Sequence, residues 1–227
     1  MASFGLSSPA SSTTAPQHPI GGPVDISMAY SAVSEGNLPL LQWTMNKLQT
    51  QTVPASSSSS NNLTYTTLSD EHGYTLLHAA ASYNQVAIIE FLLAQTTGPD
   101  EIIAFLSIGD TDDGDTALHY AGTMAAAKCL LEAAIASTTA SGSSENAGWS
   151  AARNITRIFN KHGQTALYVK QEELKELQQD EEIEEDDIEL EILQELIAYL
   201  TEWLNFITPD NWFLAEGTET ETVGTPN

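Results

Sequence analysis

Basic residues are scarce in this 227-residue sequence. Seven Lys and Arg stand against 31 Asp and Glu, which gives a formal net charge of −24. A chain this acidic repels the phosphate backbones of nucleic acids and the anionic surfaces of membranes. The composition therefore argues against nucleic-acid and membrane partners, and it favours a partner protein that offers basic patches.

Cysteine is almost absent, since Cys129 is the only one. A single cysteine excludes an internal disulfide and any cluster of Cys metal ligands. Cys129 lies in an apolar helical run, so we interpret it as a small core residue.

Targeting signals and spanning segments are also missing. No apolar stretch reaches the roughly 18 residues that a membrane-spanning helix needs. The N-terminus lacks the positive start and apolar centre of a secretory signal. It also lacks the Arg residues that are typical of a mitochondrial presequence. We expect a soluble chain of the cytoplasm or the nucleus.

Catalytic motifs are equally hard to find. The sequence contains no recognisable nucleophile elbow, phosphate loop, Cys–His pairing or paired-carboxylate site. We therefore expect no catalytic residue, no cofactor and no metal, and an enzyme is disfavoured.

The most regular stretch runs from Asp70 to Leu93. A turn signal at His72-Gly73 precedes Thr75 and an apolar run, and after a polar break a second apolar run follows at helical spacing. This pattern predicts two short helices joined by a tight turn.

Two further copies of this unit follow in the sequence. The second copy matches the first at Gly114, Thr116, Leu118, His119 and Ala121, opposite Gly73, Thr75, Leu77, His78 and Ala80. The third copy starts at Asn160 and has Tyr168 in the place of histidine. The second copy is three residues shorter between its Thr and its Leu-Leu pair, which predicts a shortened turn between its helices.

The Thr-Leu-Leu-His-Ala-Ala block of the first copy resembles the Thr-Pro-Leu-His-x-Ala signature of ankyrin repeats, with Leu76 in the place of proline. The resemblance implies an all-α fold, an ankyrin-repeat α-solenoid of stacked helix-turn-helix units with hairpin loops. The Thr-to-Thr periods of 41 and 49 residues exceed the ankyrin period of about 33. We attribute the excess to insertions between repeats.

The domain boundaries follow from these copies and from composition. We expect a disordered Ser/Thr/Pro-rich tail over 1–23, an ankyrin-repeat domain over 24–207 and a disordered acidic tail over 208–227. Within the domain we expect a capping unit at 24–48 and repeats at 70–95, 111–135 and 160–207, the last with an acidic insertion at 180–187. Polar loops are predicted at 49–62 and 137–148, and an extra helical turn after Gly98-Pro99.

The closing helix is predicted from Ile188 onward. Its apolar residues return at three- and four-residue steps, at Ile192, Leu196, Tyr199, Leu200, Trp203 and Ile207.

The family resemblance also implies roles for the motif residues. Thr75, Thr116 and Thr165 would cap the first helix of each unit, and His78 and His119 would hydrogen-bond the backbone of neighbouring units. A metal or catalytic set of His72, His78, His119 and His162 is the weaker interpretation, because their spacing is that of the repeats.

The run from Asp110 to Asp115 invites comparison with a calcium loop. An EF-hand loop needs glycine at its sixth position and glutamate at its twelfth. Here glycine is fifth and the twelfth residue is Ala121. We therefore interpret this run as a solvent-facing hairpin tip.

The resulting functional hypothesis is a protein–protein interaction module that is a monomer by itself. The resemblance implies that a partner, possibly a basic protein, binds the hairpin tips and the exposed face of the inner helices, at Glu71, His72, Tyr74, Tyr83, Asp112, Asp113, Asp115, Tyr120, Lys161, His162 and Gln164. A sharper version is an acidic escort of a basic client such as a ribosomal protein. The alternatives are a regulatory subunit and a transcription-linked nuclear adaptor.

Overall fold

The computed structural model describes residues 24–51, 64–96, 98–140, 145–179 and 188–205. Within these ranges the chain forms ten α-helices and, apart from two isolated bridges, no strand. The helices are α1 (Ile26–Ser34), α2 (Leu38–Gln51), α3 (Leu76–Ser82), α4 (Val86–Ala94), α5 (Pro99–Leu106), α6 (Ala117–Tyr120), α7 (Met124–Ala140), α8 (Glu145–Thr156), α9 (Ala166–Gln179) and α10 (Ile188–Asn205).

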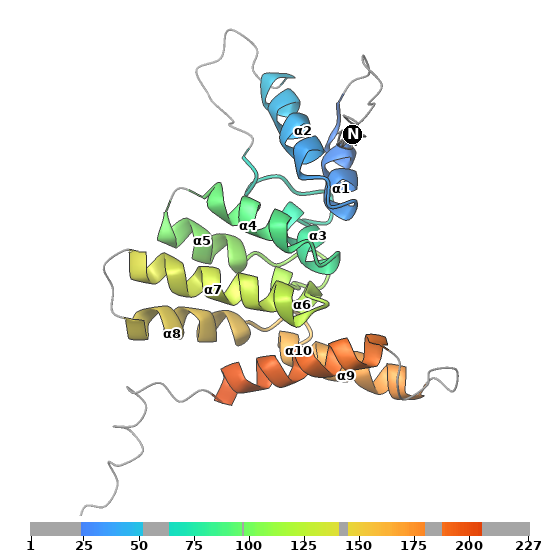
Figure 1. The fold of residues 1–227 in the computed structure, drawn as a ribbon, viewed down its shortest axis with the longest axis vertical. Coiled ribbons are helices and arrows are strands. Elements are labelled where there is room, and N and C mark those ends of the chain that lie inside the picture. The colour runs from blue at the N-terminus through green and yellow to red at the C-terminus, as the bar shows by residue number, and fades with distance from the viewer. Residues whose placement is uncertain (1–23, 52–63, 97, 141–144, 180–187, 206–227) are drawn as a thin grey trace, which may run out of the picture.

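Helix pairs stack in layers, as Figure 1 shows from α1 and α2 at one end to α9 and α10 at the other. The inner helices follow one another in contact, α1 on α3, α3 on α6 and α6 on α9. The outer helices α4 and α7 also touch, and α10 packs on both α7 and α9. This is the stacked helix-pair arrangement expected of an ankyrin solenoid.

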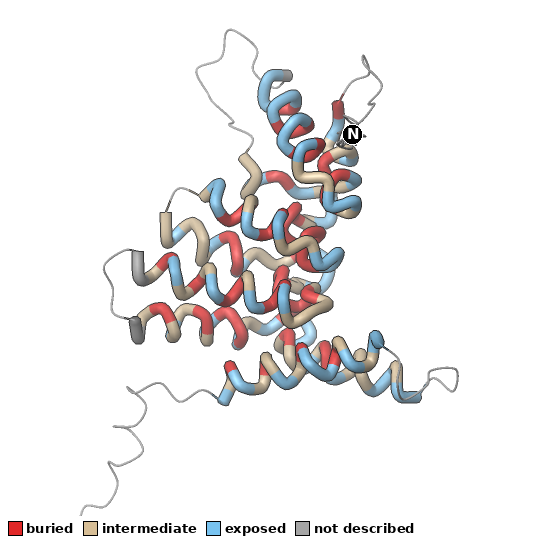
Figure 2. The backbone as a smooth tube through the Cα atoms, viewed as in Figure 1, coloured by how far each residue is buried: buried red, intermediate tan, exposed pale blue. Residues whose placement is uncertain are grey.

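Small side chains bring the inner helices together. Ala29, Ala32, Ala80 and Ala81 have no exposed surface, and they lie on α1 and α3. Leucines and isoleucines of the outer helices fill the other side of the core. Figure 2 shows the buried residues concentrated where neighbouring helices of the stack meet.

Local capping chemistry explains where the helices start. The Oδ1 atom of Asn37 accepts a hydrogen bond from the backbone N–H of Leu40 at 3.1 Å, as expected for the N-cap of α2. Thr75 and His78 form a reciprocal capping box at the start of α3. The Oγ1 atom of Thr165 accepts from the N–H of Tyr168 at 3.4 Å at the start of α9.

The turn that joins the two helices of a unit is the same in the capping unit, between α1 and α2, and in the first repeat, between α3 and α4. Gly36 and Asn84 both adopt left-handed φ angles, 67° and 55°. The residue after each of them donates its N–H to an alanine carbonyl of the preceding helix, Asn37 to Ala32 and Gln85 to Ala80, both at 2.8 Å. The capping unit and the first repeat therefore share one turn geometry.

The second repeat is shortened in its inner helix, and the prediction of a shortened turn was wrong. Three residues join α3 to α4, and three residues also join α6 to α7, whereas α6 has four residues and α3 has seven. Ala121 leaves the helix with φ −57° and ψ 121°. Thr123 then caps α7 by accepting the N–H of Ala126 at 3.3 Å, so the inner helix has no room to continue.

The predicted loop over 137–148 was wrong for most of its length. Helix α7 runs on to Ala140, and α8 begins at Glu145. The hydroxyl of Ser137 donates to the Ala134 carbonyl at 2.9 Å, so this polar residue is satisfied inside the helix. Gly148 lies where α8 packs closely on α7, because a Cβ atom at this position would lie 2.9 Å from the carbonyl oxygen of Ile135.

Helices α5 and α8 lie in the segments inserted between repeats, and both pack against α7. The predicted extra turn after Gly98-Pro99 is thus an eight-residue helix, with Pro99 at its N-terminus. In the last layer Trp149 of α8 stacks on Trp203 of α10 with a centroid distance of 5.2 Å. No helix in the described ranges is long and apolar enough to cross a membrane.

The buried face of α10 differs from the predicted one at its start. The buried residues are Leu193, Leu196, Leu200 and Trp203. Ile192 is only half-buried and Ile188 is 71% exposed, whereas Leu193 is buried. The acidic insertion 180–187, Ile207 and both predicted tails lie outside the described residues.

Candidate protein-binding surface

Each hairpin tip is built around one Asx side chain at its first position. The Oδ1 atom of Asp70 accepts the N–H groups of His72 and Tyr74, both at 2.9 Å. The Oδ1 atom of Asn160 likewise accepts those of His162 and Gln164, at 3.0 and 2.9 Å. The same local geometry therefore recurs in the first and third tips.

Asp110 is the most heavily bonded of these residues. Its Oδ1 atom accepts the N–H groups of Asp112, Asp113 and Gly114 at 2.9, 2.7 and 3.2 Å. Its Oδ2 atom accepts the N–H of Asp115 at 3.2 Å and the hydroxyl of Tyr120 at 3.0 Å. This carboxylate organises the tip from inside, and its two oxygen atoms accept five hydrogen bonds from protein donors.

The bonding of Asp110 also sets its acidity. Burial alone would raise the pKa of its carboxyl group. The hydrogen bonds from the backbone of Asp113, the hydroxyl of Tyr120 and the backbone of Gly114 and Asp112 outweigh burial and hold the pKa below its ordinary 3.8.

Neighbouring tips are joined by backbone hydrogen bonds. The N–H of Thr111 donates to the carbonyl of His72, and the N–H of Lys161 donates to the carbonyl of Asp113, each at 2.7 Å. The three tips therefore form one continuous ladder along the stack.

Side chains tie the tips together as well. His72 Nδ1 lies 2.9 Å from Asp112 Oδ2, and His162 Nε2 lies 2.9 Å from Asp113 Oδ1. The amide of Asn160 donates to Asp115 Oδ1 at 2.8 Å. The acidic residues of the second tip thus hold its neighbours on both sides.

Two buried histidines link each inner helix to the next tip, as the sequence predicted. His78 Nε2 lies 3.0 Å from the carbonyl oxygen of Asp115, and His119 Nε2 lies 3.2 Å from that of Gln164. The N–H of Thr75 donates to His78 Nδ1 at 2.9 Å, so the ring proton is on Nε2 and this atom donates to Asp115. Burial lowers the pKa of His78 and of His119 below 6.5, so both rings are neutral framework groups.

A cluster of aromatic rings lines the inner helices beside the tips. Tyr74 stacks on Tyr30 and His78 with centroid distances of 6.3 and 5.3 Å, and Tyr120 meets Tyr74 edge-on at 5.1 Å. Burial raises the pKa of Tyr30, Tyr74 and Tyr120 above 10.0. These half-buried phenols are therefore neutral hydrogen-bonding groups with an apolar body.

The structure divides the residues predicted to bind a partner into three groups. The exposed tip side chains are those of Glu71, His72, Asp112, Asp113, Lys161 and His162. Tyr74, Asp115, Tyr120 and Gln164 are half-buried in the tip and inner-helix framework. Tyr83 is 55% exposed but lies at the other end of α3, away from the tips.

Several of the exposed tip residues are already engaged within the protein. Besides the two His–Asp pairs, the Nζ atom of Lys161 donates to the carbonyls of Thr111 and Asp112, the second at 3.3 Å. Glu71 is the most exposed of the acidic tip residues, with 88% of its side chain accessible.

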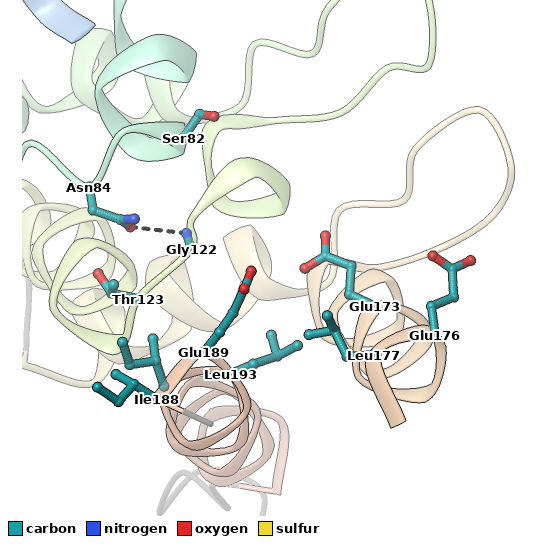
Figure 3. A pocket seen from close by; sticks show the side chains of 11 residues that line it. Ser82, Asn84, Gly122, Thr123, Glu173, Glu176, Leu177, Ile188, Glu189 and Leu193 are labelled. Atoms are coloured by element: carbon teal, nitrogen blue, oxygen red, sulfur yellow. Dashed lines mark hydrogen bonds between the residues drawn. The ribbon is translucent and has the colours of Figure 1, made fainter. Parts of the chain in front are cut away.

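A groove that the sequence analysis missed lies at the opposite end of the inner helices. It has a volume of about 850 Å³ and is bounded by the turns after α3 and α6 and by α9 and α10. In Figure 3, Ser82, Asn84 and Gly122 line one wall, and Glu173, Glu176 and Glu189 lie on the helices opposite. Its residues come from four separate segments, so no single motif marks it.

Other chemistry is sparse in the described part of the chain. No group of three or more His, Cys, Asp or Glu side chains there is arranged to hold a metal ion. Cys129 is half-buried, and burial together with Glu90 and Glu132 raises the pKa of its thiol to about 11. The thiol is therefore protonated at neutral pH.

Comparison with known families agrees with the geometry. The family model described as Ankyrin repeats (3 copies) matches residues 29–141, from within α1 to the end of α7. No protein with curated annotation matches the chain. Ankyrin repeats generally serve protein–protein interaction and are typically non-catalytic. The third tip lies beyond the matched span, yet it repeats the Asx turn, the threonine cap and the inter-tip hydrogen bonds of the others. On its motifs, its helix pairs and this match, the chain belongs to the ankyrin-repeat family.

Proposed function

We propose that this chain is a non-enzymatic interaction module that binds a basic segment of a partner protein through its hairpin tips and the exposed face of its inner helices. The observation that carries the proposal is the row of exposed carboxylates at Glu71, Asp112 and Asp113, held on a hydrogen-bonded ladder.

The ladder supports binding because it fixes the tips before a partner arrives. Backbone hydrogen bonds at 2.7 Å join both pairs of neighbouring tips. A surface that is already ordered loses little conformational entropy on association, so more of the contact energy appears as affinity.

The charges of the tips support a basic partner. Asp112 and Asp113 lie 2.9 Å from ring nitrogens of His72 and His162. A Lys or Arg of a partner would offer these exposed carboxylates a full positive charge. Exposed pairs of this kind contribute more to association rate and specificity than to affinity.

The aromatic cluster supplies the apolar part of the same surface. Tyr74 and Tyr120 are half-buried, and their rings are in contact with each other. Tyrosines that pair an apolar body with a hydroxyl group are common anchors of protein interfaces. A partner segment with an apolar side chain between basic ones matches this arrangement.

An affinity purification with matched variants tests the proposal. One variant removes three tip charges, Glu71→Gln, Asp112→Asn and Asp113→Asn. The control removes three charges from exposed residues of α4, α5 and α7, Glu90→Gln, Asp100→Asn and Glu132→Gln. The tip variant should lose the basic partners that the wild type and the control retain, as identified by mass spectrometry. Equal recovery of the same partners by all three proteins would refute the proposal.

The escort version of the function extends this proposal. It rests on the net charge of −24 and on the acidic run 180–187, which lies outside the described residues. Such a run would screen the charge of a basic client before its assembly. Neutralising 180–187 should weaken recovery of the client and increase its aggregation in a refolding assay. An unchanged recovery and unchanged aggregation would remove the escort role.

A further inference from the structure

The groove beside α9 and α10 combines an apolar floor with an acidic edge. Leu177 of α9 and Ile188, Ile192 and Leu193 of α10 supply the apolar part. Ile188 is 71% exposed although it lines the groove. An exposed isoleucine inside a hollow is a typical anchor point for an apolar side chain of a ligand.

Three glutamates supply the charge. Glu173, Glu176 and Glu189 line the groove, and Figure 3 shows their side chains together with Leu177 and Leu193. Lys170 binds both carboxylate oxygens of Glu173, at 2.8 and 3.0 Å, and is itself buried. Glu176 and Glu189 are exposed, so two carboxylates face solvent beside the apolar floor.

No Lys or Arg in the described part of the chain lines this groove. The seven Lys and Arg of the chain all lie within the described residues, at Lys47, Lys128, Arg153, Arg157, Lys161, Lys170 and Lys175. The segments 1–23, 52–63, 141–144, 180–187 and 206–227 contain none. An occupant that complements the charge must therefore come from another molecule.

We infer that this groove is a second docking site, for a partner segment in which an apolar side chain is flanked by Lys or Arg. The inference rests on the proposed function, since it gives a basic partner protein a second point of attachment. The apolar side chain would contact Ile188 and Leu193, and the flanking cations would reach Glu176 and Glu189.

Two attachment points change the strength of binding. A partner that reaches both the tips and the groove binds the second site as an intramolecular step. Each site alone can then be weak while the complete complex is stable.

Fluorescence anisotropy with a defined probe tests the groove. The probe is a short labelled peptide in which Leu and Lys alternate, and a second peptide has Ser in place of Leu at unchanged charge. The groove variants are Glu176→Gln/Glu189→Gln and, separately, Ile188→Ser. The matched control is Glu191→Gln/Glu195→Gln, which removes two exposed charges from α10 outside the groove. Circular dichroism melts establish that every variant is folded.

We expect the groove double variant to weaken binding of the Leu–Lys peptide about fivefold, and the control to change it by less than about twofold. Ile188→Ser should weaken the Leu–Lys peptide and leave the Ser–Lys peptide unchanged. Equal losses of peptide affinity in the groove and control variants would refute the proposed docking site in the groove.

The tip variant separates this inference from the proposed function. If only the tip variant loses affinity for the peptide and the groove variants bind normally, docking at the groove is refuted and binding at the tips is supported. If the groove variants alone lose binding, the groove stands and the tip surface is refuted. If the wild type binds neither peptide, both are refuted.

Discussion

His78 Nε2 donates a hydrogen bond to the carbonyl oxygen of Asp115 across 3.0 Å, from the inner helix of one repeat to the tip of the next. The same ring accepts the N–H of Thr75 on its other nitrogen. One buried side chain thus caps its own helix and fixes the neighbouring tip. His119 repeats the arrangement with Thr116 and Gln164.

Replacement of these histidines should destabilise the stack. His78→Ala leaves the N–H of Thr75 and the carbonyl of Asp115 without their partner in a buried site, which costs about 2–3 kcal/mol. His162→Ala, at an exposed tip position, is the control and should change the free energy of unfolding by less than about 0.5 kcal/mol. Urea denaturation measures both, and equal effects would contradict the framework role of His78.

Acidification should also weaken the fold through these rings. The pKa of His78 and of His119 is lower in the folded chain than the ordinary 6.5 of an unfolded one. Below about pH 6.5 the unfolded chain therefore binds more protons than the folded chain. The stability that the two neutral rings contribute is fully present above about pH 6.5 and is lost as the pH falls below it. Replacing both residues by Gln should reduce the pH dependence of the unfolding free energy between pH 7.5 and pH 5.5. The many carboxylates titrate in both proteins, so the difference between them isolates the histidines. An identical pH dependence would show that the two rings do not titrate on unfolding.

The second tip should depend on the oxygen atoms of Asp110 more than on its charge. Asn160 performs the same role in the third tip with one amide oxygen. Asp110→Asn keeps the Oδ1 acceptor but loses the Oδ2 acceptor of the Asp115 N–H and the Tyr120 hydroxyl, and should cost about 1 kcal/mol. Asp110→Ala, which removes the acceptor of four backbone N–H groups, should cost about 2–3 kcal/mol. Thermal unfolding of the two variants decides the order. A larger loss of stability for Asp110→Asn than for Asp110→Ala would contradict the role of Asp110 as the hydrogen-bond acceptor of the tip.

Three tip glycines share one backbone conformation and differ in what covers them. Gly73, Gly114 and Gly163 have φ angles of 71°, 74° and 74°. Gly163→Ala meets no atom within 4 Å and should cost about 1 kcal/mol from the left-handed backbone alone. A Cβ atom at Gly73 would lie 2.8 Å from Thr111 Cγ2 and 3.1 Å from Thr111 N, so Gly73→Ala should cost more. Equal losses in denaturant titrations would argue against the packing of the first tip on the second.

The repeat chemistry was predictable because it is local. Thr75, Gly73 and His78 stand at fixed offsets, and each performs its role within one unit or at the next, so the copies at Thr116 and Thr165 could be recognised from the first. The three missing residues of the second copy were assigned to the loop between its helices, whereas they are missing from the inner helix, which ends before Ala121. Residue counts alone do not distinguish a shorter loop from a shorter helix. Helix α8 was missed because Ser, Gly and Asn favour loops in isolation, and only packing against α7 makes Gly148 a contact residue.

The binding surface was harder to predict than the fold. His72, Asp112, Asp113 and His162 could be placed on tips, but their mutual pairing depends on how the tips stack. The groove depends on which face of α10 meets α9, and the apolar spacing alone did not distinguish Ile192 from Leu193. The partner-binding roles of all these residues stay predictions until a partner is in hand.

The central claim is that a basic partner segment binds the tips and the inner-helix face of this ankyrin stack. The most direct measurement is a titration of the ¹⁵N-labelled full chain with the Leu–Lys peptide, followed by amide chemical shifts. The account predicts shifts at Glu71, Asp112 and Asp113 and around Tyr120, with the outer helices α4 and α7 unaffected, and the loss of the tip shifts in the tip variant. Shifts confined to α4, α5 and α7, shifts confined to the groove on α9 and α10, or no shifts at all would contradict it.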